Sequence, residues 1–322
     1  MTEIENRLLW EKWRPKKIED IILLPRIKNL ISGGITDNYI FYGNYGIGKT
    51  SLARILIGKY KKNIPYIEIN SSLYTSIDVL RNEIEDFCKF KPILDVDSDI
   101  KYVFLDEFDR VSTQFQDAFK AFIEKYNSNV RFIITTNHIS KISNGIKSRI
   151  TQVNFDPQSL EEEKFLKTEI YKKIKNDILK SENIDIPKDN LVKIINKKYP
   201  DIRSIIVEIS NYSRTGNIDE NLLNSNKLKN DLYDILYNKS VGYEDIYHFV
   251  LNNFGSDKIN ELIEFLGKPF VDWSILNNKN IDKLFECNFI ISDYSFRLEN
   301  SLDPVVLGIT IIGKLRNVLL NN

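Results

Sequence analysis

A glycine-rich stretch near the start of the sequence has the residue types that bind phosphate. Residues 43–51 read GNYGIGKTS, between an apolar run and a helical pattern, and this context disfavours the alternative of an ordinary glycine-rich turn. Glycines let backbone N–H groups curl around one anion, and the positive N-terminal end of the following helix favours it. Lys49 would contact the β- and γ-phosphates of ATP, and the Thr50 hydroxyl would coordinate Mg²⁺. The predicted nucleotide-binding residues are Gly43, Asn44, Tyr45, Gly46, Ile47, Gly48, Lys49, Thr50 and Ser51.

Three carboxylates follow an apolar run in the segment IKYVFLDEFDR, residues 100–110. Asp106, at the expected end of a strand, is placed to hold Mg²⁺ through its water shell. Glu107 is placed to polarise the water that attacks the γ-phosphate. A helix N-cap with an acidic first turn is the alternative for this stretch considered alone, and the glycine-rich loop upstream disfavours it. Asp109 and Arg110 are expected to form a local ion pair or to contact a partner.

Two further polar residues occur in positions that suit phosphate chemistry. Asn137 ends the run RFIITTN, and its amide is placed to bridge the attacking water and the γ-phosphate; a turn-forming role is the alternative. Arg203 lies in the first turn of a helix that Asp201 is expected to cap, where the helix dipole disfavours a cation. We therefore expect a negative group near Arg203, with a plain surface arginine beside Asp201 as the alternative.

The segment IKSRI, residues 146–150, places Arg149 between a short helical stretch and an apolar strand. No acidic residue follows until Asp156, and none precedes it nearer than Glu124. The local sequence therefore predicts no salt bridge for Arg149, and we expect its partner elsewhere.

The elements that position these residues change in type along the chain. Up to residue 155, short apolar runs alternate with amphipathic segments, which predicts an α/β domain with a mostly parallel sheet and helices on both faces. Beyond it, the pattern is helical to the end of the sequence. We predict three domains, at residues 1–155, 156–222 and 223–322. The expected strands are 39–43, 65–69, 100–107, 130–137 and 151–155.

Composition excludes several classes of protein. The 322 residues contain 45 Lys and Arg and 45 Asp and Glu, so no overall field attracts nucleic acid or an anionic membrane. Any DNA binding must then come from local geometry. Cys88 and Cys287 lack the spacing of a zinc site or a disulfide scaffold. No apolar run is long enough for a membrane span, and the first residues are acidic where a signal peptide is basic, so we expect a cytoplasmic protein without membrane contact.

Taken in order, the motifs resemble those of an AAA+ ATPase, and more narrowly those of a small subunit of a sliding-clamp loader of the replication factor C type. The resemblance begins at WEKWRPKKIEDII and continues through GNYGIGKT, LDEFDR, TTN, KSRI and PDIRSII. These segments correspond to the adenine-pocket segment, Walker A, Walker B, the first sensor, the Ser-Arg-Cys motif and the second sensor. LDEFDR is closest to the tailed-phage loaders. The resemblance implies an AAA+ P-loop ATPase domain, a helical lid with the second sensor, and an all-α C-terminal collar that oligomerises.

The resemblance also implies roles for individual residues. Trp13 and Arg14 would line the adenine pocket. Arg149 would be an arginine finger that acts in trans, on the γ-phosphate held by the neighbouring subunit, and this would explain its missing local carboxylate. Arg203 would be the second sensor, in contact with the nucleotide.

A loader without net charge would bind DNA phosphates through helix N-termini and a few placed cations. Two stretches, residues 70–84 and 111–119, offer such helix N-termini, with plain helix capping as the alternative. Gln116 corresponds to a glutamine that in the family links DNA contact to the ATP site. The candidate DNA-binding residues are Ser72, Thr75, Ser76, Arg81, Ser112 and Thr113. A candidate clamp-facing patch, for which a core position is the alternative, contains Phe87, Phe90, Ile93 and Leu94.

The resemblance implies an ATP-hydrolysing subunit that opens a ring-shaped sliding clamp and loads it onto primer–template DNA during replication. Its cofactors would be ATP and Mg²⁺. Its partners would be the clamp, the DNA and other loader subunits, in a hetero-oligomer expected to be a pentamer with several copies of this chain. Two alternatives keep the same ATP site: a helicase loader or replication initiator, and a non-hydrolysing scaffold subunit of a clamp loader. No helix-turn-helix pattern follows residue 223, which disfavours the initiator, and intact Lys49, Glu107 and Arg149 disfavour the scaffold.

Overall fold

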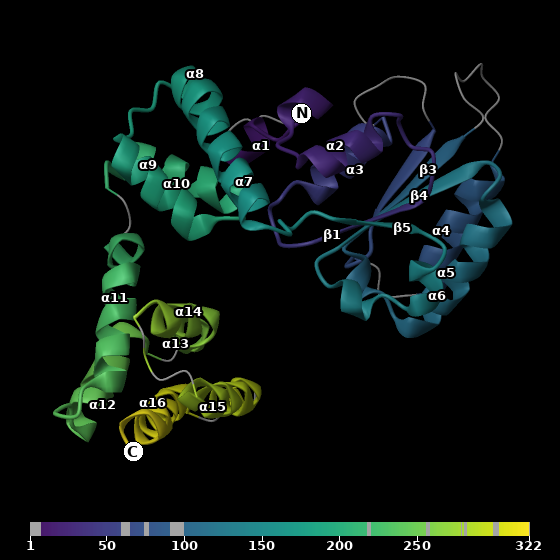
Figure 1. The fold of residues 1–322 in the computed structure, drawn as a ribbon. Coiled ribbons are helices and arrows are strands. Elements are labelled where there is room, and N and C mark those ends of the chain that lie inside the picture. Colours follow the sequence, from purple (N-terminus) through teal and green to yellow (C-terminus); the bar gives the residue numbers. More distant parts are fainter. Residues whose placement is uncertain are drawn as a thin grey trace. The chain divides into compact units, whose positions relative to one another are not determined.

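A parallel sheet organises the first part of the chain in the computed structural model (Figure 1). Its strand order is β2-β3-β4-β1-β5, and every neighbouring pair is parallel, which confirms the predicted sheet. Because β4 lies between β3 and β1, the loops that follow these three strands lie at the same edge of the sheet. The strands are β1 (Tyr39–Tyr42), β2 (Tyr66–Asn70), β3 (Lys101–Asp106), β4 (Val130–Thr136) and β5 (Thr151–Asn154).

The chain divides into two compact units, residues 1–218 and 219–322. The predicted boundary at residue 222 lies inside helix α11 (Glu220–Tyr237). Among the described residues, no helix is long and apolar enough to cross a membrane. The structure describes residues 8–58, 65–73, 77–90, 100–217, 220–255, 258–277, 279, 282–298 and 303–321.

Helices cover both faces of the sheet. Successive side chains of a strand point to opposite faces, and both sets are therefore buried. In β3, Val103 and Leu105 pack into one core cluster, whereas Phe104 packs into the other. In β1, Ile40 joins the first cluster and Phe41 the second. Burial on both faces explains why these strands read as continuous apolar runs. The helices and 3₁₀ turns around the sheet are α2 (Pro25–Ile31), α3 (Lys49–Leu56), α4 (Ile77–Lys89), η3 (Phe108–Arg110), α5 (Thr113–Tyr126), η4 (Ile139–Lys141) and α6 (Asn144–Lys147).

Helices after β5 form the lid, and a short N-terminal helix, α1, packs against its last helix, α10. Ser159 caps the first lid helix, and Asp201 caps α10 as predicted, by accepting from the Ser204 amide at 3.0 Å. Gly216, at φ 71°, ends α10. The elements are α1 (Leu9–Lys12), η2 (Ile18–Asp20), α7 (Leu160–Lys173), the π-helix η5 (Ile174–Leu179), α8 (Lys180–Glu182), α9 (Lys188–Lys198) and α10 (Ile202–Thr215).

The second unit is helical throughout its described residues, as predicted for the C-terminal region. Its buried residues form one cluster with α16 as a major contributor. Gly308 of α16 allows a close approach of α13, because a Cβ atom there would lie 2.4 Å from Ile259 Cδ1. Buried Arg316 donates to the carbonyl oxygens of Ile235 and Val241 and so fixes α16 against α11. The remaining helices are α12 (Tyr243–Asn253), α13 (Ile259–Leu266), α14 (Lys268–Leu276), α15 (Asp282–Leu298) and α16 (Pro304–Leu320).

Candidate nucleotide-binding site

The glycine-rich loop after β1 has the backbone of a phosphate-binding loop. Gly43, Gly46 and Gly48 have φ angles of 139°, 65° and 101°, a region that favours glycine. Gly46 also has no room for a side chain, because a Cβ atom there would lie 1.7 Å from Asp201 Oδ1. Helix α3 begins at Lys49, and no side chain caps it. Its first backbone amides are therefore left to bind an anion.

Lys49 is buried beneath the loop and contacts three oxygen atoms. Its Nζ donates to the carbonyl oxygens of Gly43 at 2.8 Å and Asn44 at 2.6 Å, and to Asn137 Oδ1 at 2.8 Å. Burial lowers the pKa of Lys49 to about 8, and nearby carboxylates, Asp156 foremost, partly oppose this effect. The fold thus brings together two residues, Lys49 and Asn137, that the sequence analysis assigned to one site from separate motifs.

Thr50 and Asp106 form a corner of oxygen atoms that suits a hard cation. Thr50 Oγ1 donates to Asp106 Oδ1 at 2.9 Å, and the Thr135 hydroxyl donates to the same carboxylate oxygen. Glu107 has φ 55°, and its amide donates to Thr135 Oγ1 at 3.3 Å. Mg²⁺ is usually held by one or two carboxylates together with substrate phosphates, and this corner fits that requirement. Within the described part of the chain, no group of three or more His, Cys, Asp and Glu side chains could hold a metal by itself.

The third carboxylate of the acidic segment has a partner that was not predicted. Asp109 accepts a hydrogen bond from the Thr136 hydroxyl at 3.1 Å, and no ion pair joins it to Arg110 in the structure. Thr135 and Thr136 are adjacent at the end of β4, so this strand holds the acidic segment at two points. The expected local ion pair is absent because the neighbouring strand offers hydroxyl groups instead.

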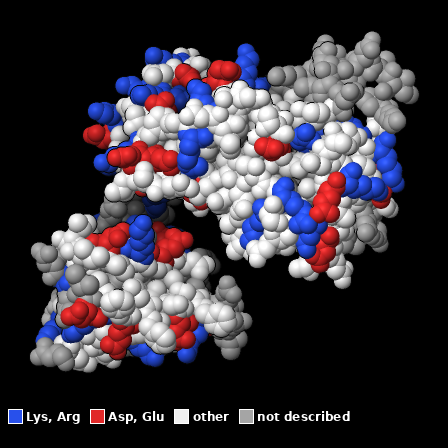
Figure 2. Space-filling model, turned by 45° about the vertical axis from the view of Figure 1, so that its right-hand side comes forward, with Lys and Arg blue, Asp and Glu red and all other residues white. Residues whose placement is uncertain are grey.

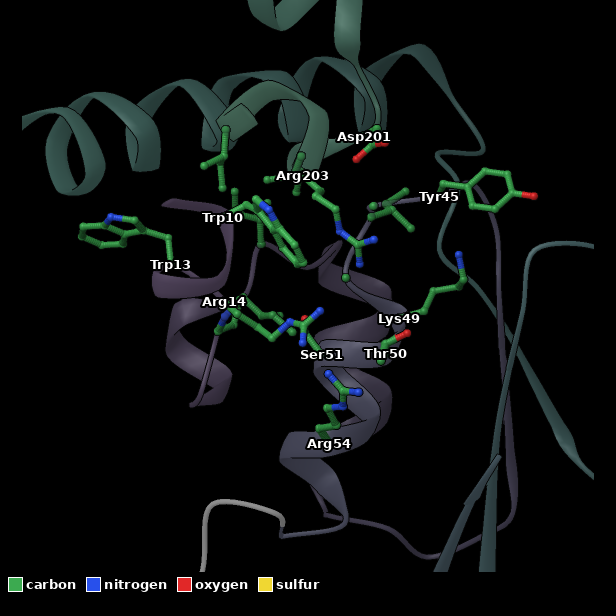
Figure 3. Close-up of a pocket in the computed structure, with 18 of the residues that line it drawn as sticks. Trp10, Trp13, Arg14, Tyr45, Lys49, Thr50, Ser51, Arg54, Asp201 and Arg203 are labelled. Carbon is green, nitrogen blue, oxygen red and sulfur yellow. The ribbon is translucent and has the colours of Figure 1, made fainter. Parts of the chain in front are cut away.

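A cavity of about 350 Å³ lies above the loop, lined by residues of the sheet edge, the lid and the N-terminal segment (Figure 3). Trp13 and Arg14 both line it, and isoleucines of the lid give it an apolar part that suits a nucleobase. Gly43 and Asn44 do not line it, since their carbonyl groups face Lys49. The other predicted residues that line it are Tyr45, Gly46, Ile47, Gly48, Lys49, Thr50, Ser51, Asp106, Glu107, Asn137 and Arg203.

The N-terminal segment is fixed to the lid by a residue that the sequence analysis did not identify. Trp13 Nε1 donates to Glu182 Oε1 at 2.7 Å, and Lys12 Nζ lies 2.8 Å from the same oxygen. Trp10, which also lines the cavity, was missed as well. The available signal was its place in WEKWRPKKIEDII, the segment that resembles the family's adenine-pocket segment.

Among the described residues, the neighbour of the Arg203 side chain is an aromatic ring rather than an acidic side chain. Its guanidinium carbon lies 5.0 Å from the centre of the Trp10 ring, and no acidic side chain among the described residues pairs with it. Asp201, two residues earlier, binds the amide and hydroxyl of Ser204 instead. Within the described part of the chain, an aromatic face is therefore the contact that holds the Arg203 guanidinium.

The prediction that Arg149 has no local salt bridge is wrong. Its Nη2 lies 2.7 Å from Glu124 Oε1, and its Nη1 donates to the Gly145 carbonyl oxygen at 2.8 Å. Glu124 belongs to the last turn of α5, and the packing of α5 against α6 closes the sequence separation of 25 residues. The two side chains are 38% and 61% exposed, so the pair contributes little to stability.

The candidate DNA-binding residues differ in their local roles. The Ser72 amide and hydroxyl both bind Asn70 Oδ1, in a turn after β2, and α4 begins only at Ile77, so Ser72 does not cap that helix as expected. Ser112 does cap α5, by accepting from the Phe115 amide, and Thr113 is the first residue of α5. Thr75, Ser76 and the Arg81 side chain lie outside the described residues.

Gln116 and the proposed clamp-facing patch are split between core and surface. Gln116 is buried, donates to the Lys141 carbonyl oxygen at 3.0 Å and accepts from the Ser143 amide at 2.8 Å. Phe87 is partly buried, whereas Phe90 is 55% exposed. Ile93 and Leu94 lie outside the described residues. On the face shown in Figure 2, basic and acidic side chains are interspersed, so no large field of one sign marks a nucleic-acid surface there.

Comparisons with known proteins agree with this geometry. Residues 39–157 match the family model described as ATPase family associated with various cellular activities (AAA). Residues 162–224 match the model described as sliding-clamp-loader large subunit, AAA+ ATPase lid domain. The two models together span the sheet domain and the lid.

Similar chains occur in an archaeon and a giant virus. A replication factor C small subunit of Methanococcus vannielii is 34% identical over 205 residues, which cover 61% of this chain and 61% of that protein's length. A protein of Acanthamoeba polyphaga mimivirus, named as a replication factor C small subunit, is 34% identical over 263 residues, which cover 74% of this chain and 69% of that protein. Among solved structures, a variant of Thermotoga maritima RuvB has a TM-score of 0.50 at 16% identity, covers 72% of this chain and 83% of its own, and shares the fold alone.

Proposed function

This chain belongs to the replication factor C small-subunit family of AAA+ ATPases, and on that premise we propose that it is an ATP-hydrolysing subunit of a sliding-clamp loader. It would open a ring-shaped clamp and load it onto primer–template DNA. The proposal of ATP hydrolysis rests on one observation: three loops lie together at one edge of the sheet, where Lys49 contacts Asn137 and Thr50 contacts Asp106. These contacts join the phosphate loop, the acidic segment and the end of β4.

Each residue at this edge would have a defined task when ATP is bound. Lys49 and the first amides of α3 would hold the phosphates, and Thr50 with Asp106 would hold Mg²⁺, which neutralises charge on the transferred phosphoryl group. Glu107 would orient and polarise the attacking water, and Asn137 would hold that water against the γ-phosphate. Trp13, Arg14 and the apolar part of the cavity would bind the base.

Two arginines would complete the site from outside the sheet. Arg203, on the lid, would act as the second sensor of the γ-phosphate in its own chain. Arg149 would act on the nucleotide of the neighbouring subunit, which requires that it leave Glu124 when subunits assemble. The exposure of this ion pair supports the proposal, because breaking it costs little.

The proposed assembly is a hetero-oligomer, expected to be a pentamer, that contains several copies of this chain. The C-terminal unit would provide the collar that joins the subunits. In support, helix α15 exposes a row of large apolar side chains, which are unusual on the surface of a monomer. They are Phe285, Phe289 and Phe296, at 81%, 77% and 74% exposure. DNA contact would come from the start of α5, at Ser112 and Thr113, among other points.

The test is ATP hydrolysis measured with and without the two macromolecular substrates. We expect turnover to rise when primer–template DNA and a ring clamp are present together, and to rise much less with either alone. The complex of this chain with its natural partner subunits should be used. Equal stimulation by DNA alone and by DNA with clamp would contradict clamp loading and favour another DNA-dependent AAA+ role.

A further inference from the structure

Arg203 occupies a position where electrostatics alone would not keep a cation. It lies in the first turn of α10, whose dipole is positive at that end. Among the described residues, no carboxylate pairs with it. Its guanidinium carbon lies 5.0 Å from the centre of the Trp10 ring, within the range of a cation–π contact. The indole is therefore the contact that holds this side chain at the cavity.

Trp10 contacts a second guanidinium as well. The Arg14 guanidinium carbon lies 5.5 Å from the same ring centre. Figure 3 shows the side chains of Arg14 and Arg203 both beside the Trp10 ring, with helix α3 and its residues Thr50 and Ser51 next to them. Two like charges repel each other. The Glu11 carboxylate, 3.2 Å from Arg14 Nη1, and the electron-rich face of the indole both offset part of that repulsion. The ring thus gathers two cations on the side of the cavity where the phosphate loop lies.

The position of Trp10 is fixed by the lid rather than by the sheet. Trp10 belongs to α1, which packs against α10. Lys12, the last residue of α1, and Trp13, its C-cap, both bind Glu182 of α8. The ring and the Arg203 backbone are therefore parts of one packed group of helices, and their relative position is set before a nucleotide arrives.

Arg203 and Lys49 face the same space. Burial is the main cause that lowers the pKa of Lys49, and the positive charge of Arg203 lowers it further. Both side chains line the cavity. An anion bound at Lys49 would therefore also attract the Arg203 guanidinium.

From this geometry we propose that Trp10 is a positioning residue that holds Arg203 where the terminal phosphate of ATP would lie, and so favours ATP over ADP. The inference rests on the proposed nucleotide site and adds a determinant of specificity to it. If the Arg203 guanidinium is already in place, no conformational entropy is lost in ordering it when the γ-phosphate binds. Only ATP has that phosphate, so the gain in affinity applies to ATP and not to ADP. Trp10 would act through Arg203 and need not touch the nucleotide.

Two simpler roles for Trp10 predict a different pattern. If the indole only stacked on the base, its loss would weaken ATP and ADP equally, because the two share the same adenosine. If it only filled space between α1 and α10, its loss would also weaken both. The ratio of the ATP and ADP dissociation constants therefore separates positioning of Arg203 from both alternatives.

The experiment is titration of the full chain with ATP and with ADP, for the wild type and three variants. We expect Trp10→Leu to lower the affinity for ATP about 3- to 10-fold more than that for ADP, the effect of one partly desolvated cation–π contact. Trp10→Phe keeps an aromatic face and should restore most of the ratio. Trp13→Leu, the matched control on the same segment, should change both affinities alike. An equal loss of ATP and ADP affinity in Trp10→Leu, or a ratio in Trp10→Phe as low as in Trp10→Leu, would overturn the proposal.

Two further measurements test the same proposal independently. Arg203→Ala should lower the ATP to ADP ratio by itself, and adding Trp10→Leu should lower it no further, since the two residues act as one unit. In a chain with Trp13→Phe and Trp273→Phe, Trp10 is the only tryptophan, and ATP should change its fluorescence more than ADP does. Additive losses, or equal fluorescence changes with both nucleotides, would contradict the proposal. A wild-type chain that binds neither nucleotide would instead contradict the proposed ATP site itself.

Discussion

The Nζ atom of Lys49 lies 2.8 Å from Asn137 Oδ1, and this contact links the loop after β1 to the end of β4. The other two acceptors of Lys49 are backbone carbonyl oxygens of its own loop. All three acceptors are uncharged, so a phosphate oxygen would bind the ammonium more strongly than they do. We expect nucleotide binding to replace some of these contacts. Substitutions at different residues of the site should therefore have different effects on nucleotide binding and on turnover.

Substitution of Lys49 should weaken ATP binding, whereas substitution of Glu107 should slow ATP hydrolysis. Lys49→Ala removes the buried cation and should lower ATP affinity by about 10- to 150-fold, as expected for a charge-assisted hydrogen bond of ~1.5–3 kcal/mol. Glu107→Gln keeps the shape of the site and should leave affinity within about twofold while slowing turnover by ~10²–10⁴-fold. Titration and single-turnover hydrolysis measure the two quantities. Rapid turnover by Glu107→Gln would remove Glu107 from the catalytic role, and normal affinity of Lys49→Ala would remove Lys49 from phosphate binding.

Thr135 should be important for turnover although it is not a charged residue. Its hydroxyl contacts both Asp106 and the amide of Glu107, and the side chain is buried. Thr135→Val keeps the volume, removes both contacts and should lower kcat by about tenfold or more, since a hydrogen bond to a charged group is worth ~1.5–3 kcal/mol. Thr135→Ser should restore activity. The matched control is Thr136→Val, which removes the contact to Asp109 and leaves Asp106 in place; an equal defect in both variants would show a general loss of packing.

ATP affinity should fall as the pH rises through about 8. Burial lowers the pKa of Lys49 to about 8 in the protein without nucleotide, so the ammonium is present below that pH and is lost above it. Bound phosphate favours the protonated form, and linkage then gives a decrease of up to about tenfold per pH unit above the pKa of the free protein. Titrations between pH 7 and 9.5 measure the slope. AMP lacks the β- and γ-phosphates, so its weaker binding should show no such slope, and parallel curves for ATP and AMP would contradict the assignment.

The parts of the fold that sequence predicted are those with strong local signals. The strands β1, β3 and β4 were identifiable because both of their faces are buried, which makes each of them a mostly apolar run. The phosphate loop was identifiable because its glycines occupy backbone conformations that other residues avoid, as at Gly46 and Gly48. The cap of α10 was identifiable because Asp201 directly precedes a helical pattern.

The contacts that sequence missed join residues that lie far apart in the chain or on different elements. Glu182 binds Trp13 across 169 positions, and nothing in either local segment indicates this contact. Glu124 and Arg149 meet because α5 packs against α6, and a search for acidic neighbours along the sequence cannot find such a pair. Side-chain partners across elements depend on packing angles, which periodicity does not encode.

The chain cut after residue 218 should keep its nucleotide site. Among the described residues, the fully buried members of the C-terminal cluster begin at Leu232, whereas those of the two sheet-domain clusters end at Leu166. Each unit therefore has a core of its own. We expect residues 1–218 to bind ATP with an affinity within about threefold of the full chain, a difference below 1 kcal/mol, and to remain monomeric in sedimentation. A fragment that forms the full oligomer would show that the collar proposal is wrong.

The final prediction separates action of Arg149 on a neighbouring subunit from action within its own chain. Because Arg149 pairs with Glu124 rather than with any residue lining the cavity, we expect Arg149→Ala to bind ATP almost normally. Its turnover in the complete loader should fall by at least ~10³-fold, the lower end for arginine fingers. Glu124→Gln frees the guanidinium and should raise turnover by less than about fivefold, since exposed ion pairs are worth up to ~1 kcal/mol.

Mixing two inactive variants tests the direction of this action. Arg149→Ala has an intact Glu107, and Glu107→Gln has an intact Arg149, so a mixed assembly contains some interfaces that combine a working Glu107 with a working Arg149 from the adjacent chain. Those interfaces should hydrolyse ATP, and the mixture should exceed the sum of the two separate variants. Light scattering or sedimentation with a labelled chain must show that subunits exchange. Proven exchange without recovered activity, or wild-type turnover by Arg149→Ala with clamp and DNA present, would leave the Arg149–Glu124 pair as a local surface contact that joins α5 to the turn after α6.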